Sequence, residues 1–408
     1  MLLKHPATGG EFCFAEFFFT VDFPLPPPYN ETIIKQKGEF IMIIKNGFVF
    51  QEDGSFLQQD LYVENDRIVA SEAEVTDKTV IDASGLKVIP GLVDVHSHGA
   101  KGHDFCDADP EGLKVILQYE KEHGITSYCP TSMTLAKDQL MDIFATATKV
   151  EPSKELAHII GVNMEGPLID IKKKGAQAGE YISVPDASFF RKCNEASGNQ
   201  IKLVTLAPNV DKAYEFIQEV KDEVVISIGH TTANYDCAKK AMDMGAKHVT
   251  HLYNAMPPFA HRDPGVVGAA CDTPDCMVEL ICDGFHIHPA TIRTTFKMFG
   301  DERIVLISDS MMATGMPNGK YELGGQEVTM TDCFAALSDG TIAGSATNLF
   351  DCMKKAMEFG IPEAAAIFAA TRNPAKSIGV YDKVGSLTPG KYADIVIVND
   401  NYEIQQVI

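Results

Sequence analysis

The chain has 408 residues, of which 45% are hydrophobic, and a formal net charge of −21. Its length exceeds that of one ordinary domain, and its hydrophobic content is sufficient for a large core. The acidic balance disfavours nucleic acid and anionic membranes as partners, and no apolar stretch reaches the roughly 18–20 residues that a membrane span requires. Ten scattered cysteines without a Cys-x-x-Cys pair predict free thiols in a reducing cytoplasm.

Residues 1–41 differ in texture from the rest of the chain, with a phenylalanine-rich run followed by a proline-rich run at 24–28. A signal peptide does not fit, because Glu11 and Glu16 interrupt the apolar run and no small-residue cleavage site follows it. We therefore predict an atypical N-terminal extension over residues 1–41 that is poorly ordered or loosely packed.

Short alternating segments follow between residues 42 and 87, separated by Asp-Gly, Asn-Asp and Ser-Gly turns. Such a pattern is typical of a small antiparallel β unit. The segment 384–398, near the C-terminus, has the same texture. We predict that residues 42–90 and 379–408 pair into one small β-sandwich domain.

The centre of the chain alternates apolar, β-rich runs with amphipathic, helix-like stretches. The eight runs cover residues 92–96, 127–131, 159–165, 202–207, 224–230, 248–251, 278–283 and 304–309. The helix-like stretches include residues 110–122, 135–149, 211–220, 233–244 and 289–299. Eight buried strands alternating with helices predict the α/β class and a (β/α)₈ TIM-like barrel over residues 91–378. A doubly wound open sheet is the alternative, but no glycine-rich phosphate loop follows the first strand.

Ionisable side chains close most of these runs, and in such barrels the chemistry lies at the C-terminal strand ends. The first run ends in His96-Ser97-His98, in which the two imidazoles point the same way because strand side chains alternate. Later runs end in Glu165, His230, His251, Asp283 and Asp309. A single strand-end histidine is more often a hydrogen-bonded structural residue, and Asp309 alone could cap a helix. Six such ends at one mouth predict a functional site instead.

The residue types at these ends predict a catalytic divalent metal with one position open to water. Such a metal brings the pKa of bound water toward about 7 and polarises a carbonyl. Glu165, His230 and His251 would form one site, and His96 and His98 would form a second site that shares Glu165. Asp309 is then the general base and later the acid. Nitrogen and oxygen ligands accept zinc, iron, cobalt or manganese, so the metal and the use of one ion or two stay open.

Several segments together resemble the N-acetylglucosamine-6-phosphate deacetylases of the amidohydrolase superfamily, from about residue 42 to the C-terminus. The segments are residues 88–99, 165–167, 229–231, 250–256 (THLYNAM), 283–289 (DGFHIHP) and 308–315. The resemblance implies metal-dependent deacetylation of N-acetyl-D-glucosamine 6-phosphate to D-glucosamine 6-phosphate and acetate, in amino-sugar catabolism. In the implied reaction, metal-activated hydroxide attacks the acetamide carbonyl, and Asp309 takes the proton from the water and gives it to the leaving amine.

The same resemblance implies roles for further residues. Glu165, His230 and His251 match the family's metal ligands, and His96 and His98 offer a second position. The implied substrate-binding residues are Ala176, Gln177, Asn254, Ala255, Arg262, His286, Ile342, Ala343 and Gly344. Gln177 stands where some relatives carry a histidine near the substrate carbonyl, so it can donate a hydrogen bond there but cannot carry charge. Similar enzymes are homodimers with active sites near the interface, so a phosphate ligand can come from the partner subunit.

Arg262 suits a phosphate, because its guanidinium offers a planar fork of donors. The run Lys172-Lys173-Lys174 is interpreted as a solvated face and left outside the site.

Two alternatives remain beside this hypothesis. Many other amidohydrolases bridge two metals with a carbamylated lysine from the fourth strand, but that strand ends here in residues 206–209 (LAPN), without a lysine. A non-catalytic scaffold on the same barrel would typically lose ligands, and this chain keeps them. N-acetylgalactosamine 6-phosphate stays open as the substrate.

Overall fold

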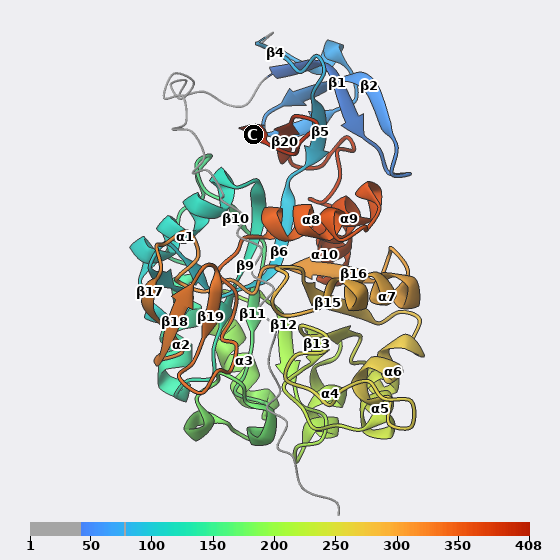
Figure 1. Cartoon of the computed structure of the whole chain (residues 1–408). Helices are drawn as coiled ribbons and strands as arrows, with labels where there is room; N and C mark the ends of the chain where they lie inside the picture. Colours follow the sequence, from blue (N-terminus) through green and yellow to red (C-terminus); the bar gives the residue numbers. More distant parts are fainter. Residues whose placement is uncertain (1–41, 77–78) are drawn as a thin grey trace, which may run out of the picture. The chain divides into compact units, whose positions relative to one another are not determined.

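The computed structural model describes residues 42–76 and 79–408 (Figure 1). The predicted extension at residues 1–41 lies outside these described residues, and so do residues 77 and 78.

Strands from both ends of the chain form one seven-stranded sheet with the order β21-β20-β5-β1-β2-β3, in which β4 also pairs with β1 (Figure 1). Its strands are β1 (Met42–Phe50), β2 (Phe56–Glu64), β3 (Arg67–Val69), β4 (Val80–Asp82), β5 (Lys87–Pro90), β20 (Ile395–Val398) and β21 (Ile404–Val407). β20 pairs antiparallel with β5, and side chains such as Ile44, Val63 and Ile395 pack in a core of their own. A small β domain built from the two ends is therefore confirmed, with all its strands joined in a single sheet.

The barrel consists of eight parallel strands that lie in chain order. They are β6 (Leu92–Ser97), β9 (Ile125–Ser132), β11 (Val162–Met164), β12 (Ile201–Leu206), β13 (Val225–Ile228), β14 (His248–Val249), β15 (Met277–Ile281) and β16 (Ile304–Ile307). A short strand, β10 (His158–Ile159), pairs with β9. The last strand returns to the first, since Asp309 N donates to His96 O at 2.9 Å and His98 N donates to Ser310 O at 2.8 Å. The predicted (β/α)₈ barrel is thus confirmed over the open doubly wound sheet.

The helices of the described chain follow the strands. They are α1 (Pro110–Glu122), α2 (Lys137–Thr146), α3 (Ala187–Ala196), α4 (Ala213–Val220), α5 (Tyr235–Met244), α6 (Gly265–Cys271), α7 (Pro289–Phe299), α8 (Leu349–Glu358), α9 (Glu363–Ala370) and α10 (Arg372–Ser377), with 3₁₀ turns η1 (Glu72–Glu74), η2 (Phe105–Asp107), η3 (Ile171–Lys173) and η4 (Gly179–Tyr181). α1 begins where expected, because Asp109 caps it by accepting from Glu111 N and Pro110 occupies its first position. Leu113, Ile116 and Leu117 form its buried face.

A three-stranded antiparallel sheet is inserted between β16 and α8, and the sequence analysis did not predict it. It comprises β17 (Gly319–Leu323), β18 (Gln326–Thr331) and β19 (Phe334–Ala336); a two-stranded hairpin, β7 (Gly99–Ala100) and β8 (His103–Asp104), follows β6. Leu323 and Val328 share a core with Met133 and Met311 from the barrel loops. The pair Gly324-Gly325 between two alternating segments is a hairpin pattern that could have revealed this insertion.

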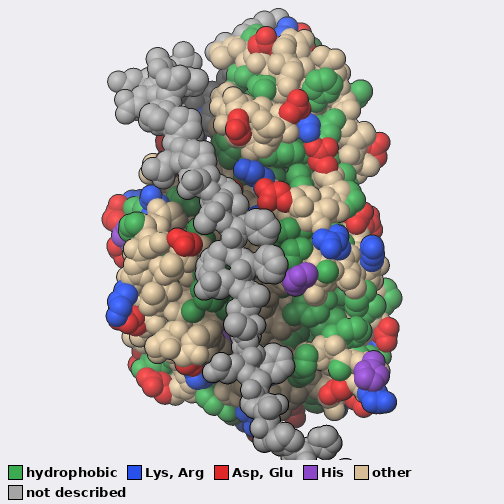
Figure 2. Space-filling model, viewed as in Figure 1, with side chains coloured by type: hydrophobic (Ala, Val, Ile, Leu, Met, Phe, Trp, Pro, Cys, Tyr) green, Lys and Arg blue, Asp and Glu red, His purple; other side chains and the backbone are tan. Residues whose placement is uncertain are grey.

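The described surface carries charges of both signs. On the face drawn in Figure 2, acidic and basic side chains are scattered among hydrophobic and other side chains. None of the helices in residues 42–76 and 79–408 is both long and apolar enough to cross a membrane.

Candidate metal centre

The C-terminal ends of five barrel strands bring together the six residues that the sequence singled out most strongly. His96 and His98 belong to the end of β6, whereas Glu165, His230, His251 and Asp309 follow β11, β13, β14 and β16. All six side chains are buried, from 0% exposed for His96 to 7% for Asp309. Four imidazoles and two carboxylates in one buried cluster are costly to desolvate unless they are paired or hold a cation.

Backbone strain accompanies three of these residues. His230, His251 and Asp309 each lie two residues beyond the last residue of a strand and adopt φ values of +46°, +26° and +50°. Such left-handed conformations cost about 1–3 kcal/mol each in residues other than glycine and persist where the surrounding structure imposes them. The same left-handed turn follows three strands, so the fold accepts a cost in stability in order to hold these three side chains in place.

The first ligand group consists of Glu165, His230 and His251. Glu165 Oε1 lies 3.1 Å from Nε2 of each histidine, and the two Nε2 atoms lie 3.1 Å apart. His230 Nδ1 lies 2.8 Å from Lys173 O, which can only accept, so this nitrogen carries the proton and Nε2 presents a lone pair in the neutral ring. Three electron-rich atoms at this spacing fit the ligand shell of a divalent cation.

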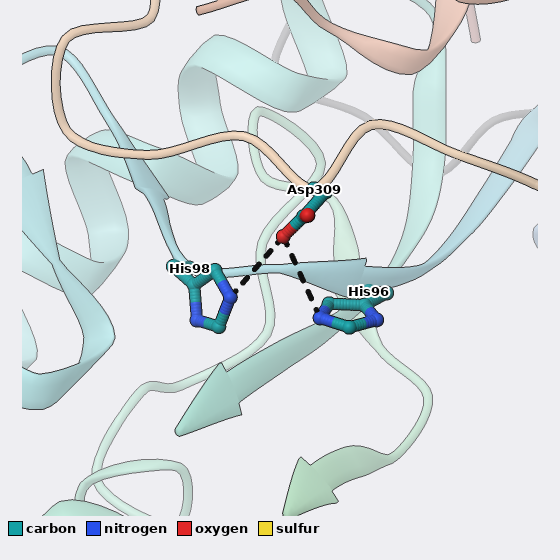
Figure 3. A group of neighbouring side chains, drawn as sticks. All are labelled: His96, His98 and Asp309. Atoms are coloured by element: carbon teal, nitrogen blue, oxygen red, sulfur yellow. Dashed lines mark ion pairs between the residues drawn. The ribbon is translucent and has the colours of Figure 1, made fainter. Parts of the chain in front are cut away.

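The second group consists of His96, His98 and Asp309. Figure 3 shows both rings directing a nitrogen at the same carboxylate oxygen, with Nε2–Oδ1 distances of 3.6 Å for His96 and 3.3 Å for His98. Their Nδ1 atoms face acceptors, Glu279 Oε2 at 2.9 Å and Thr131 O at 3.1 Å. His96 Nε2 is buried without a hydrogen-bond partner among the described residues, and a cation would satisfy it.

Glu165 lies between the two groups. Its Oε1 is 3.5 Å from His96 Nε2, and its Oε2 is 3.4 Å from His98 Nε2, so the carboxylate approaches all four imidazoles. If each group held a cation, Glu165 would be the carboxylate close to both.

The electrostatics of the cluster favour cations. Burial by itself would lower the pKa of His98, but the Asp309 and Glu165 carboxylates raise it to about 10. Burial likewise opposes ionisation of Glu165, yet His96, His230 and His251 hold its pKa well below the usual range. Because an imidazole must be neutral to bind a metal, protons and metal ions compete for the same atoms.

Glu279, which the sequence analysis missed, links the two groups. It lies inside β15 with 0% exposure, and its Oε2 accepts hydrogen bonds from His96 Nδ1 and His251 N, both at 2.9 Å. Carboxylates behind metal-binding histidines fix the ring orientation and raise the basicity of the ligand nitrogen. A glutamate within the otherwise apolar run Met277–Ile281 was the available sequence signal.

A cavity of about 320 Å³ opens beside the cluster. Of the predicted residues, His98, Glu165, Ala176, Gln177, His230, His251, Asn254, Ala255, His286, Asp309, Ile342 and Gly344 line it. His96 and Ala343 are fully buried and do not line the cavity. Arg262 is exposed in the segment before α6 and is not among the lining residues.

Two members of the lysine run border the cavity, and Lys172 is exposed to solvent, as the interpretation of a solvated face expects. Lys172 and Lys173 line the cavity, because the 3₁₀ turn η3 runs along its wall and Lys173 O contacts His230. His286 also lines the cavity and is held by Asp283, whose Oδ2 lies 2.7 Å from His286 Nδ1. Asp283 Oδ1 also accepts from His286 N at 3.0 Å. Cationic and hydrogen-bonding groups therefore border the metal cluster.

A (β/α)₈ barrel with two His/carboxylate groups beside a cavity at its strand ends defines a metal-dependent hydrolase. The sequence model of the amidohydrolase family matches residues 87–408. The chain therefore belongs to the amidohydrolase family.

Its relatives narrow this assignment. The chain is 38% identical over 370 residues to an N-acetylglucosamine-6-phosphate deacetylase of Bacillus subtilis, covering 89% of this chain and 91% of that protein. It is 32% identical to an N-acetylgalactosamine-6-phosphate deacetylase of Escherichia coli O157:H7, covering 87% and 94%. Among solved structures, an N-acetylglucosamine-6-phosphate deacetylase from Pasteurella multocida superposes with a TM-score of 0.83 at 28% identity, covering 90% and 97%.

Proposed function

We propose that this chain hydrolyses the acetamide bond of N-acetyl-D-glucosamine 6-phosphate and releases D-glucosamine 6-phosphate and acetate. The observation that carries the proposal is the buried cluster of Glu165 and four imidazoles, with Asp309 beside it, at the wall of the cavity. Its relatives at 30% identity and above include several N-acetylglucosamine-6-phosphate deacetylases.

One or two divalent cations fit the two ligand groups. Glu165, His230 and His251 would hold one ion, and His96 and His98 would hold a second together with a carboxylate. When bound, a divalent cation polarises the amide carbonyl and lowers the pKa of a nearby water. Zinc, iron, cobalt and manganese all suit these donors.

Asp309 is the proton carrier in this proposal. Burial raises its pKa, but the neighbouring histidines His96, His98 and His251 lower the pKa below the usual value for aspartate, so the carboxylate is ionised at neutral pH. An ionised Oδ atom accepts a proton from water as the water attacks, and the resulting acid donates that proton to the leaving amine. One group thus serves both halves of the amide hydrolysis.

The polar wall of the cavity suits a phosphorylated sugar. Asn254 and His286 offer groups for sugar hydroxyls and phosphate, and Lys172 and Lys173, which line the cavity, offer local positive charge in a chain whose net charge is −21. Arg262 is exposed and does not line the cavity of its own subunit, so it would reach a phosphate in the partner subunit across the interface of a homodimer.

The nine cysteines in the described part of the chain are free thiols, which supports a cytoplasmic location.

Acetate release from a panel of N-acetylated sugars tests the proposal. The panel contains N-acetylglucosamine and N-acetylgalactosamine, each with and without a 6-phosphate, and the enzyme is assayed after chelation and after reconstitution with each metal. We expect turnover with N-acetylglucosamine 6-phosphate that chelation abolishes. Preference for the galactosamine isomer would move the assignment to the second sugar, and no turnover with any metal would refute it.

A further inference from the structure

Gln177 is engaged with protein groups at both ends of its side chain. It is 1% exposed, and its Oε1 lies 2.6 Å from Thr134 N, whereas its Nε2 lies 2.7 Å from Glu165 Oε2. The second hydrogen of Nε2 faces Met133 Sδ at 3.5 Å. The carbonyl oxygen and one amide hydrogen therefore have strong partners within the protein, and the second amide hydrogen has a weak one.

The orientation of this amide follows from its partners. The Thr134 backbone N–H can only donate, so the atom facing it must be the carbonyl oxygen of Gln177. The amino group then necessarily faces Glu165, whose ionised carboxylate can only accept. The backbone of Gln177 is also held, since its N donates to Lys174 O at 2.9 Å.

The fixed amide of Gln177 restrains the carboxylate of Glu165. Its Oε1 is turned toward His230 and His251, both at 3.1 Å, while its Oε2 is held by Gln177. The amide of Gln177 stays neutral and keeps its donor at every physiological pH, unlike a histidine in the same place. A carboxylate restrained at one oxygen presents the other oxygen to a cation in a single orientation.

We propose that Gln177 is a positioning residue that holds Glu165 Oε2 and thereby orients Glu165 Oε1 toward the His230/His251 metal group. The hydrogen of Nε2 that has a strong acceptor is used on Glu165, and the second hydrogen faces only the weak acceptor Met133 Sδ. This proposal rests on the metal site of the proposed function but is independent of its substrate.

The test measures metal affinity directly. Apoprotein prepared from the full chain is titrated with Co²⁺ in the absence of sugar, by calorimetry and by the visible absorption of the bound ion. The variants are Gln177→Leu and Gln177→Met, which keep the bulk and remove the donor. Gln326→Leu is the matched control, because Gln326 Nε2 donates to the neighbouring Ala176 O and has no contact with Glu165.

We expect Gln177→Leu to weaken the Co²⁺ affinity of the first site about 10- to 100-fold, as removal of a group behind a metal ligand typically does. The Co²⁺ spectrum should change, since the ligand geometry changes. Gln326→Leu should leave both affinity and spectrum unchanged. If Gln177→Leu does not fold, as judged by circular dichroism, Gln177→Met carries the same expectation.

Unchanged Co²⁺ affinity and spectrum in a folded Gln177 variant would overturn the proposal. A fall in kcat without any change in metal binding would do so as well, and would return Gln177 to the substrate carbonyl. Absence of acetate release from every sugar would refute the proposed function, yet leave the effect on Co²⁺ binding as the test of Gln177.

Discussion

Replacing Asp309 with asparagine separates proton transfer from metal binding at the Glu165–His230–His251 group. Asparagine has nearly the same shape as aspartate but cannot accept and return a proton. Asp309 is not a member of the Glu165–His230–His251 group, so this group should keep its metal. The change therefore removes one chemical function while it leaves the neighbouring ligand group complete.

The size of the effect follows from the role of Asp309. A positioned general acid–base residue contributes typically 10²- to 10⁴-fold to the rate, which corresponds to about 3–5 kcal/mol of transition-state stabilisation. The assay compares kcat for acetate release with metal content measured by mass spectrometry on the same preparation. We expect kcat to fall within this range at one retained metal ion per chain. A residual rate within about tenfold of the original enzyme, with metal retained, would remove Asp309 from the proton-transfer role.

Three other predictions concern the groups around the cluster. Glu279→Gln keeps the shape but removes the charge that His96 Nδ1 faces at 2.9 Å, so metal affinity should fall about tenfold or more; equal affinity in a chelator competition would contradict this. Arg262→Ala should raise KM for the phosphorylated sugar far more than for unphosphorylated N-acetylglucosamine, and equal effects on both would speak against phosphate binding. Because its carboxylate neighbours raise the pKa of His98 to about 10, a metal ion must displace a proton from His98 below that pH. Despite its burial, the pKa of His96 is raised as well by neighbouring carboxylates, so the second site's affinity should rise at least about tenfold per pH unit as the pH increases toward 10. A flat profile in a pH series of titrations would contradict the raised pKa.

The elements with local patterns were predicted well. α1 was expected at residues 110–122 and begins at Pro110 because Asp109 and Pro110 are local capping residues. The eight strands were visible as apolar runs, since barrel strands are buried on both faces. α6 was missed, because Gly265–Cys271 consists of small and apolar residues that are mostly buried and lack an amphipathic pattern.

In the candidate site, too, the sequence indicated some features and not others. Strand-end histidines and carboxylates could be recognised from neighbouring residues alone, but their pairing could not. The sequence hypothesis grouped His96 and His98 with Glu165, whereas the structure also places Asp309 Oδ1 3.3 Å from His98 Nε2. This neighbour depends on the return of the last strand to the first, where Asp309 N bonds to His96 O.

The sequence by itself determined the class of fold, the metal-binding character of the strand ends and the resemblance to deacetylases, because periodicity and residue type are local properties. Only the tertiary structure decided which histidines approach the same carboxylate oxygen and that Glu279 hydrogen-bonds residues of both ligand groups. It also decided that Lys172 and Lys173 line the cavity and that Gln177 donates to Glu165. Those relations join residues from different strands and loops, and their distances are set by the closure of the barrel and the packing of its loops.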